Sequence, residues 1–217
     1  MQLVENLNID AIQTPKISDI DTIDTDPPTK TTIIGIDPSI NSTGICVNKN
    51  NKNVYYNIVS KRTKKLEKFN SKYINKYINI LFYEKNTDKS LNYNEKEVEK
   101  AKNILYICNF IKKIIKKHKP TVVIMEGLSY GSNGQLGDLG GLNFSIRMVL
   151  LEMGVKFVIV PPTTWKKQQL GIAGAEKDII VKAWKNIDKN IANIDEIKLD
   201  DLADSYFLAH FDYQNQS

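Results

Sequence analysis

Cysteine, histidine and arginine are scarce in this chain of 217 residues, and their scarcity excludes several classes of protein. The two cysteines, Cys46 and Cys108, lie inside apolar segments without a metal-ligand spacing, so we expect neither a disulfide framework nor a zinc site. The two histidines, His118 and His210, each follow an apolar helical stretch and stand apart from other ligand types, which argues against a histidine general base.

Long hydrophobic runs are also missing. No apolar run approaches the roughly 18 residues that cross a bilayer, so we expect no membrane-spanning segment. The acidic N-terminal stretch has neither the acid-poor character of a transit peptide nor the apolar core of a signal peptide. The sequence therefore predicts a cytoplasmic protein that is not secreted.

Positive charge is abundant but unevenly distributed. The formal net charge is +5, yet residues 49–119 hold 19 Lys and Arg against 6 Asp and Glu, whereas residues 1–30 hold 6 acids against 2 lysines. A basic centre of this kind is typical of a surface that faces a polyanion such as nucleic acid. The alternative is a coding bias, because the whole chain is rich in Lys, Asn and Ile.

The chain reads as a flexible arm over residues 1–30 followed by one α/β domain over residues 31–217, with a basic, partly helical insertion at about 61–95. Three strands, a helix and a further strand follow one another, which predicts an antiparallel meander extended by parallel strands. We expect a mixed five-stranded sheet flanked by helices. The predicted strands are 32–37, 44–47, 54–59, 121–126 and 156–160, and the predicted helices are 95–118, 142–153, 164–169, 176–186 and 198–211.

Acidic residues stand at the ends of apolar segments. Asp37 and Glu126 each end a buried strand, where an unpaired carboxylate costs several kcal/mol unless a cation, a cap or solvent satisfies it. Asp201 and Asp204 share one face at the start of the last helix, and Asp200 is also a near neighbour of Asp204. Acids in a first helical turn can simply complement the helix dipole.

Oxygen ligands without a Cys or His cluster favour Mg²⁺ or Mn²⁺. Two such ions, roughly 3.5 to 4 Å apart, activate water and stabilise the leaving oxygen of a phosphodiester. The acids therefore indicate phosphoryl-transfer chemistry.

Four segments resemble, in order and context, the motifs of RuvC-type Holliday junction resolvases, which have an RNase H-like fold. The segments are Ile34-Gly35-Ile36-Asp37-Pro38-Ser39 with Thr43-Gly44; Val123-Ile124-Met125-Glu126; Asp201-Leu202-Ala203-Asp204; and Pro161-Pro162-Thr163-Thr164-Trp165-Lys166 with Gly171 and Ala175-Glu176-Lys177. The resemblance implies two Mg²⁺ or Mn²⁺ ions per active site, held by Asp37, Glu126, Asp201 and Asp204. If the acidic pair of the last motif is displaced by one residue, Asp200 takes the place of Asp201 as a metal ligand.

The same resemblance implies that Lys166 and Lys177 assist phosphate binding and catalysis. It also implies a homodimer that nicks a four-way junction symmetrically. The arm and the insertion have no counterpart in the compact bacterial enzymes, and they favour a viral or phage relative.

Candidate DNA-binding residues lie outside these motifs. Bacterial members place an aromatic wedge shortly after the second acid, where this chain has Tyr130, which either stacks on a base or packs at the base of a loop. Residues 127–141 include six glycines and predict a mobile loop, in which Gly131 and Gly134 either let the backbone approach phosphates or belong to a solvent-exposed linker. Lys64 and Lys65 either bind phosphates or form a solvated face.

Three functions remain in competition. The first is a metal-dependent endonuclease that resolves Holliday junctions by paired nicks. The second is a broader nuclease of the same fold that debranches forks and flaps. The third is a junction-binding module without catalysis, which would be indifferent to metal and to the acids.

Overall fold

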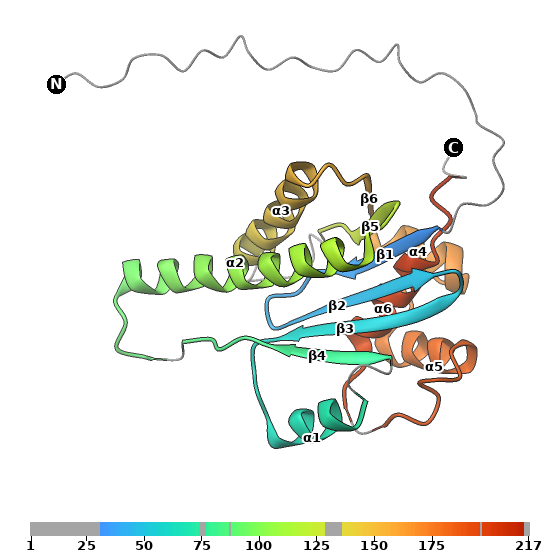
Figure 1. Ribbon diagram of the computed structural model, residues 1–217, viewed down its shortest axis with the longest axis horizontal. Coiled ribbons are helices and arrows are strands. Elements are labelled where there is room, and N and C mark those ends of the chain that lie inside the picture. The colour runs from blue at the N-terminus through green and yellow to red at the C-terminus, as the bar shows by residue number, and fades with distance from the viewer. Residues whose placement is uncertain (1–30, 74–76, 87, 129–135, 196, 215–217) are drawn as a thin grey trace, which may run out of the picture.

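The protein forms one layered α/β unit in the computed structural model, which describes residues 31–73, 77–86, 88–128, 136–195 and 197–214. The predicted arm over residues 1–30 lies outside these residues. A central sheet separates two groups of helices (Figure 1). None of the helices in the described residues is long and apolar enough to cross a membrane.

The sheet has six strands in the order β4-β3-β2-β1-β5-β6. The strands are β1 Thr32–Asp37, β2 Ser42–Lys49, β3 Lys52–Val59, β4 Ile78–Phe82, β5 Val122–Glu126 and β6 Phe157–Val160. The first three strands are antiparallel neighbours, and β4, β5 and β6 each pair in parallel with the strand beside them. The predicted mixed sheet is confirmed, with one strand more than expected.

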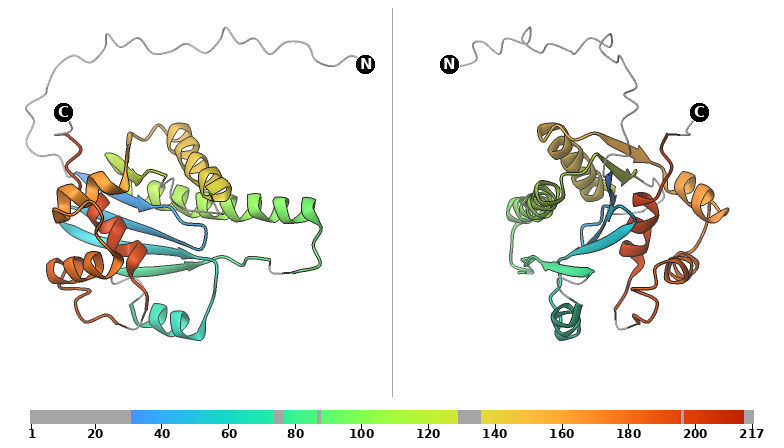
Figure 2. Two further views of the ribbon diagram at one scale, coloured as in Figure 1. Left: turned by 180° about the vertical axis from the view of Figure 1, so that it is seen from behind. Right: turned by 45° about the vertical axis from the view of Figure 1, so that its right-hand side comes forward.

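Helices cover both faces of this sheet. They are α1 Lys64–Tyr73, α2 Tyr93–His118, α3 Leu136–Glu152, α4 Pro162–Leu170, α5 Lys177–Ile187 and α6 Asp200–Ala209. Helices α2 and α3 pack on one face, whereas α4, α5 and α6 lie on the other, and α1 lies beside β4 (Figures 1 and 2). Alternate residues of each strand therefore enter two separate hydrophobic cores.

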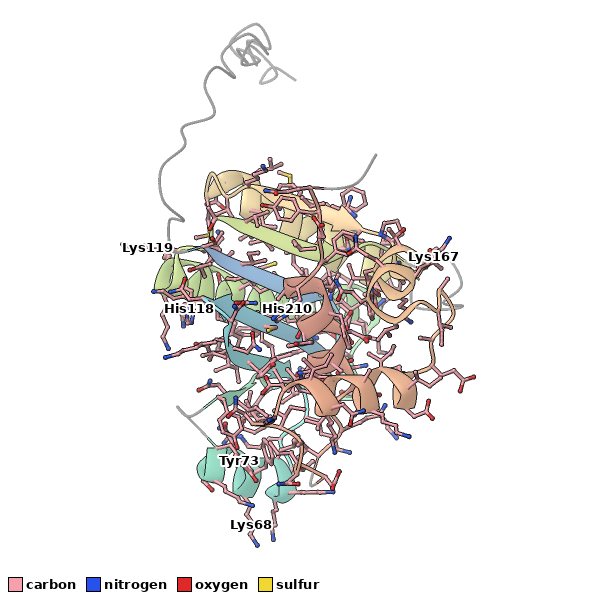
Figure 3. The ribbon with its side chains drawn as sticks, turned by 90° about the vertical axis from the view of Figure 1, so that its right-hand side faces the viewer. Lys68, Tyr73, His118, Lys119, Lys167 and His210 are labelled. Atoms are coloured by element: carbon pink, nitrogen blue, oxygen red, sulfur yellow. The ribbon has the colours of Figure 1, made fainter. Side chains whose placement is uncertain are left out.

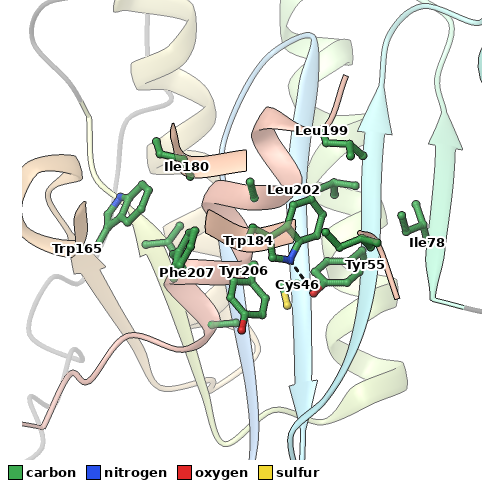
Figure 4. Close-up of a cluster of buried hydrophobic side chains, with 14 of the residues drawn as sticks. Cys46, Tyr55, Ile78, Trp165, Ile180, Trp184, Leu199, Leu202, Tyr206 and Phe207 are labelled. Atoms are coloured by element: carbon green, nitrogen blue, oxygen red, sulfur yellow. Dashed lines mark hydrogen bonds between the residues drawn. The ribbon is translucent and has the colours of Figure 1, made fainter. Parts of the chain in front are cut away.

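The core beneath α6 contains the largest buried side chains. Trp165 and Trp184 are fully buried, and Phe207 is 1% exposed (Figure 4). The indole N–H of Trp184 donates to the hydroxyl of Tyr55 across 3.1 Å, and that hydroxyl donates to Asp188 across 2.5 Å. These bonds satisfy the polar atoms that the aromatic residues bring into the core, and they join β3 to the end of α5.

Helix α2 has clear signals at both ends. Asn92 accepts from the backbone N–H of Glu95, and the Glu95 carboxylate accepts from the backbone N–H of Asn92, which forms a capping box. Lys119 ends the helix in the left-handed region with φ 47°. The helix spans 26 residues, and its N-terminal part extends beyond the sheet (Figure 1; Figure 2, left).

Two sequence predictions are wrong in detail. The segment predicted as a basic insertion contributes strand β4, because Ile78 and Ile80 are buried at the sheet edge while hydrogen bonds pair the backbone with β3. Helix α3 begins at Leu136, inside the predicted glycine loop. Its glycines are poor helix formers, yet Gly137, Gly140 and Gly141 all lie within this helix.

Candidate active site

Two acids end neighbouring strands at the same end of the sheet. Asp37 ends β1 and Glu126 ends β5, and these strands run parallel with Ile36 opposite Met125. Ile36 and Met125 enter the core beneath α2 and α3. Because side chains alternate along a strand, Asp37 and Glu126 point to the opposite face, where α6 lies.

Two glycines allow α6 to lie directly against the sheet. Gly44 is the cross-strand partner of Asp37, and a Cβ atom there would be 1.9 Å from the backbone oxygen of Asp201. A Cβ atom at Gly35 would be 2.1 Å from the backbone oxygen of Ser205. Only residues without a side chain permit this approach, which brings the first turn of α6 to Asp37.

Burial and mutual repulsion shape the ionisation of this acidic cluster. Burial raises the pKa of Asp37 well above its ordinary value, and the charges of Glu126, Asp204 and Asp201 raise it further. Burial and the charge of Glu126 raise the pKa of Asp204 to about 7. Burial also raises the pKa of Asp201 and of Glu126. Four carboxylates from three elements therefore oppose one another's ionisation, as expected where like charges share a site.

Asp200 is placed differently from its neighbours. Its carboxylate pairs with Lys198 across 2.9 Å and with Lys177 across 3.4 Å. Burial opposes its ionisation, but these two lysines hold its pKa below the ordinary value. Asp201 and Asp204, rather than Asp200, act on the Asp37 charge.

Lys166 and Lys177 flank the acids. The ammonium of Lys166 donates to the backbone oxygen of Ala175 across 3.3 Å, and it lowers the pKa of Glu126 and Asp204 against the effect of their burial. Lys177 loses hydration by partial burial, yet the charges of Asp200 and Asp201 raise its pKa. Both sequence-predicted lysines therefore lie near the predicted acids.

Two side chains that the sequence did not single out for the site fix the position of Glu126. The indole N–H of the fully buried Trp165 donates to Glu126 Oε2 across 2.7 Å. The side-chain amide of Asn143 in α3 donates to the Glu126 backbone oxygen across 3.1 Å. The place of Trp165 directly before Lys166, in the fourth resolvase-like segment, was the available signal.

The donor chemistry of the site fits divalent cations. Asp37, Asp201 and Asp204 have no ion pair within the described part of the chain, although burial makes an unpaired carboxylate costly. Across the same residues, no three His, Cys, Asp or Glu side chains are arranged around a single point as ligands. The carboxylate oxygens of these acids are of the type that Mg²⁺ and Mn²⁺ prefer.

The structure describes two of the five predicted DNA-binding residues, Lys64 and Lys65. Tyr130, Gly131 and Gly134 lie outside the described residues. Lys64 and Lys65 are exposed at the start of α1, which packs beside β4, three strands away from β1. In Figure 3, Lys68 of α1 lies far from Lys167 of α4, the neighbour of Lys166.

The sheet order, the crossover to β5 and the acids on β1, β5 and α6 define an RNase H-like fold. Solved structures place it among the RuvC-like folds. Thermus thermophilus RuvC has a TM-score of 0.51 at 15% identity, with 82% of this chain and 91% of that chain covered. T. thermophilus RuvC in complex with a Holliday junction substrate has a TM-score of 0.52 at 16% identity, covering 82% and 90%.

The yeast mitochondrial Holliday junction resolvase Ydc2 also matches, with a TM-score of 0.49 and 13% identity over 85% of this chain and 78% of that chain. No family model matches this sequence, and no curated protein matches it either. The likeness to RuvC therefore extends to the fold, at low sequence identity.

Proposed function

We propose that this protein is a divalent-metal-dependent endonuclease that cuts branched DNA, with the four-way junction as its principal substrate. The observation that carries the proposal is the cluster of Asp37, Glu126, Asp201 and Asp204, four partly buried carboxylates with raised pKa values on a RuvC-like fold. A solely structural cluster of this kind would be destabilising, because each carboxylate raises the cost of ionising the next.

Each part of the site has a separate chemical role in this proposal. The four acids hold two Mg²⁺ or Mn²⁺ ions, which supply charge neutralisation and water activation for phosphodiester hydrolysis. Asp200 keeps Lys177 beside the acids through its ion pair. Lys166 and Lys177 bind the phosphate oxygens and stabilise the negative charge that develops on them. No histidine takes part in proton transfer.

Cleavage of a labelled mobile four-way junction tests this function. We expect paired nicks with Mg²⁺ or Mn²⁺, no cutting with chelator, and little cutting of linear duplex. Asp204→Asn removes one ligand charge and should reduce cleavage by at least about 100-fold, the size typical of losing one electrostatic group from an active site. Asp178→Asn is the matched control, because Asp178 is exposed and should leave cleavage unchanged.

The competing functions predict different results in the same assay. A debranching nuclease would cut Y-forks and flaps as fast as four-way junctions. A binding module would bind junctions tightly and cut none, and Asp204→Asn would not change its affinity. Robust junction cutting by a variant carrying both Asp37→Asn and Glu126→Gln would sink the proposed mechanism.

The proposed enzyme acts as a homodimer, because paired symmetric nicks require two active sites on one junction. An apolar groove between α2 and α3 supports this assembly. Leu105 is 59% exposed, Phe144 58%, Met148 66% and Leu151 63%, all on these two helices. Exposed apolar side chains gathered on adjacent helices are typical of a protein interface.

Lysines at the start of α1 extend the proposed DNA surface. The backbone N–H of Ser60 donates to the backbone oxygen of Asn41 across 3.1 Å, so the end of β3 lies beside the turn that follows Asp37. Helix α1 therefore starts from the same end of the sheet as the acids. Lys64 and Lys65 are suited to bind the phosphates of a DNA arm that leaves the cut site.

A further inference from the structure

A separate cavity lies beneath the part of α2 that extends beyond the sheet. It has a volume of about 380 Å³ and is lined on its other sides by the connection between β4 and α2 and by Asp138 at the start of α3. Ile40, Leu91 and Ile104 form its apolar walls. Ile40 follows Asp37 in the turn between β1 and β2, so the cavity opens at the active-site end of the sheet, on the face opposite α6.

Asn103 is an unusual residue for its place on α2. It lies one helical turn before Ile107, on the same side of α2. Closer to the C-terminal end of the helix, this side packs into the hydrophobic core. Asn103 is only 4% exposed, and its side-chain amide has no hydrogen-bond partner among the residues that the structure describes. Its amide atoms are accessible from the cavity that the residue lines, so they can bind a ligand there. Its position therefore points to a ligand with both a donor and an acceptor.

The rim of the cavity is positively charged. Lys85, Lys89 and Lys96 line it, and no described residue forms an ion pair with any of them. Two of the three lining carboxylates are already neutralised: Asp138 pairs with Lys100 across 3.3 Å, and Glu99 pairs with Lys102 across 2.6 Å. Asp88 is the remaining acid, so the surplus charge is positive. The ligand should therefore carry negative charge as well.

We propose that this cavity takes one unstacked nucleotide of the bound DNA, next to the strand position that is cut. This inference rests on the proposed function. It explains how the enzyme would select the DNA sequence that it cuts. A base fits between apolar walls, an Asn amide pairs with adjacent donor and acceptor atoms of an adenine edge, and lysines contact the flanking phosphate. A volume of about 380 Å³ lies within the range of ligand pockets.

Binding can be tested without cutting by replacing Mg²⁺ with Ca²⁺. A series of four-way junctions is prepared, each with the fluorescent base 2-aminopurine at one position near the cut. The fluorescence of this base rises when it is no longer stacked on its neighbours. We expect one position to brighten with wild-type protein and to remain dim with Asn103→Leu. With Mg²⁺, Asn103→Leu should lower the preference for adenine at that position by about 10-fold, as for loss of one bidentate base contact.

Asn94→Leu is the matched control, because Asn94 is an exposed asparagine on the same helix and does not line the cavity. Mn²⁺ titration and thermal melting of Asn103→Leu show whether the fold and the acidic site are retained. If that variant does not fold, the exposed pair Lys89→Ala and Lys96→Ala replaces it. This pair should also abolish the brightening at that position.

Three outcomes overturn the inference. Junction cutting without any brightened position refutes the nucleotide cavity and leaves the proposed function intact. Equal base preference in wild type and Asn103→Leu does the same. If wild type neither binds nor cuts branched DNA, the proposed function fails. Asn103-dependent binding of free dAMP would then assign the cavity to a free nucleotide instead of a substrate base.

Discussion

The hydrogen bond from Trp165 to Glu126 gives a test at the scale of one atom pair. Trp165→Phe keeps an aromatic ring in the core but removes the N–H that donates to Glu126 Oε2 across 2.7 Å. Partners that orient a metal-binding carboxylate typically contribute 10- to 100-fold in metal affinity, so we expect a loss of about 10-fold. Calorimetric titration with Mn²⁺ in the absence of DNA measures this loss.

Trp184→Phe is the control for that experiment. Its indole N–H donates to the Tyr55 hydroxyl and has no part in the acidic cluster. Both variants lose one buried hydrogen bond and a similar volume, so both should be destabilised by about 1–3 kcal/mol. Equal Mn²⁺ affinity of the two variants would show that Trp165 only packs.

Sequence reasoning located single residues where their position along a strand carries the information. Asp37 and Glu126 drew attention because each ends an apolar strand, where a carboxylate needs a cation, a cap or solvent, and the structure places these strands side by side. Asp200 and Asp201 were not separable in advance, because helical spacing places either one near Asp204. Their difference depends on Lys198, two residues before Asp200, and on Lys177, which reaches Asp200 from α5. The contact from α5 leaves no pattern in the sequence around Asp200.

At the scale of elements, the contact between β2 and α6 determines where the acids lie. Gly44→Ala places a Cβ atom 1.9 Å from the Asp201 backbone oxygen, so α6 must move away from the sheet. Overpacking of this kind costs about 1–3 kcal/mol. We expect a lower melting temperature and weaker Mn²⁺ binding, because the shift separates Asp201 and Asp204 from Asp37.

Gly137→Ala separates this effect from the general effect of replacing a glycine. Gly137 lies in α3 with no atom within 4 Å of its Cβ position, so alanine there favours the helix and should not lower stability. Wild-type Mn²⁺ affinity in Gly44→Ala would contradict the role assigned to the α6 contact.

Elements with a regular hydrophobic period were predicted well, and those stabilised by tertiary contacts were not. Helix α2 was found almost to its ends, because its apolar positions repeat over many turns between a capping box and Lys119. Strand β4 was missed because Asn79 interrupts a short run of isoleucines and a lysine-rich context surrounds it. The start of α3 was missed because glycine disfavours a helix when judged alone.

At the scale of the whole molecule, the groove between α2 and α3 predicts how two copies meet. Met148 is 66% exposed in this groove, and Met148→Glu would place a charge in the proposed interface. A buried unpaired charge costs several kcal/mol, which is enough to dissociate a dimer at micromolar concentration. We expect sedimentation to show a dimer for wild type and a monomer for this variant.

Ile187→Glu is the matched control, because Ile187 is 57% exposed at the end of α5, on the other face of the sheet. It should remain a dimer. A monomeric Met148→Glu protein keeps the four acids of the site and the cavity beneath α2, so it should still nick one strand of a junction. If Met148→Glu makes the first nick but no longer makes the second, the apolar groove is needed for symmetric cleavage of the junction. A wild-type monomer that makes paired nicks would instead separate resolution from dimerisation.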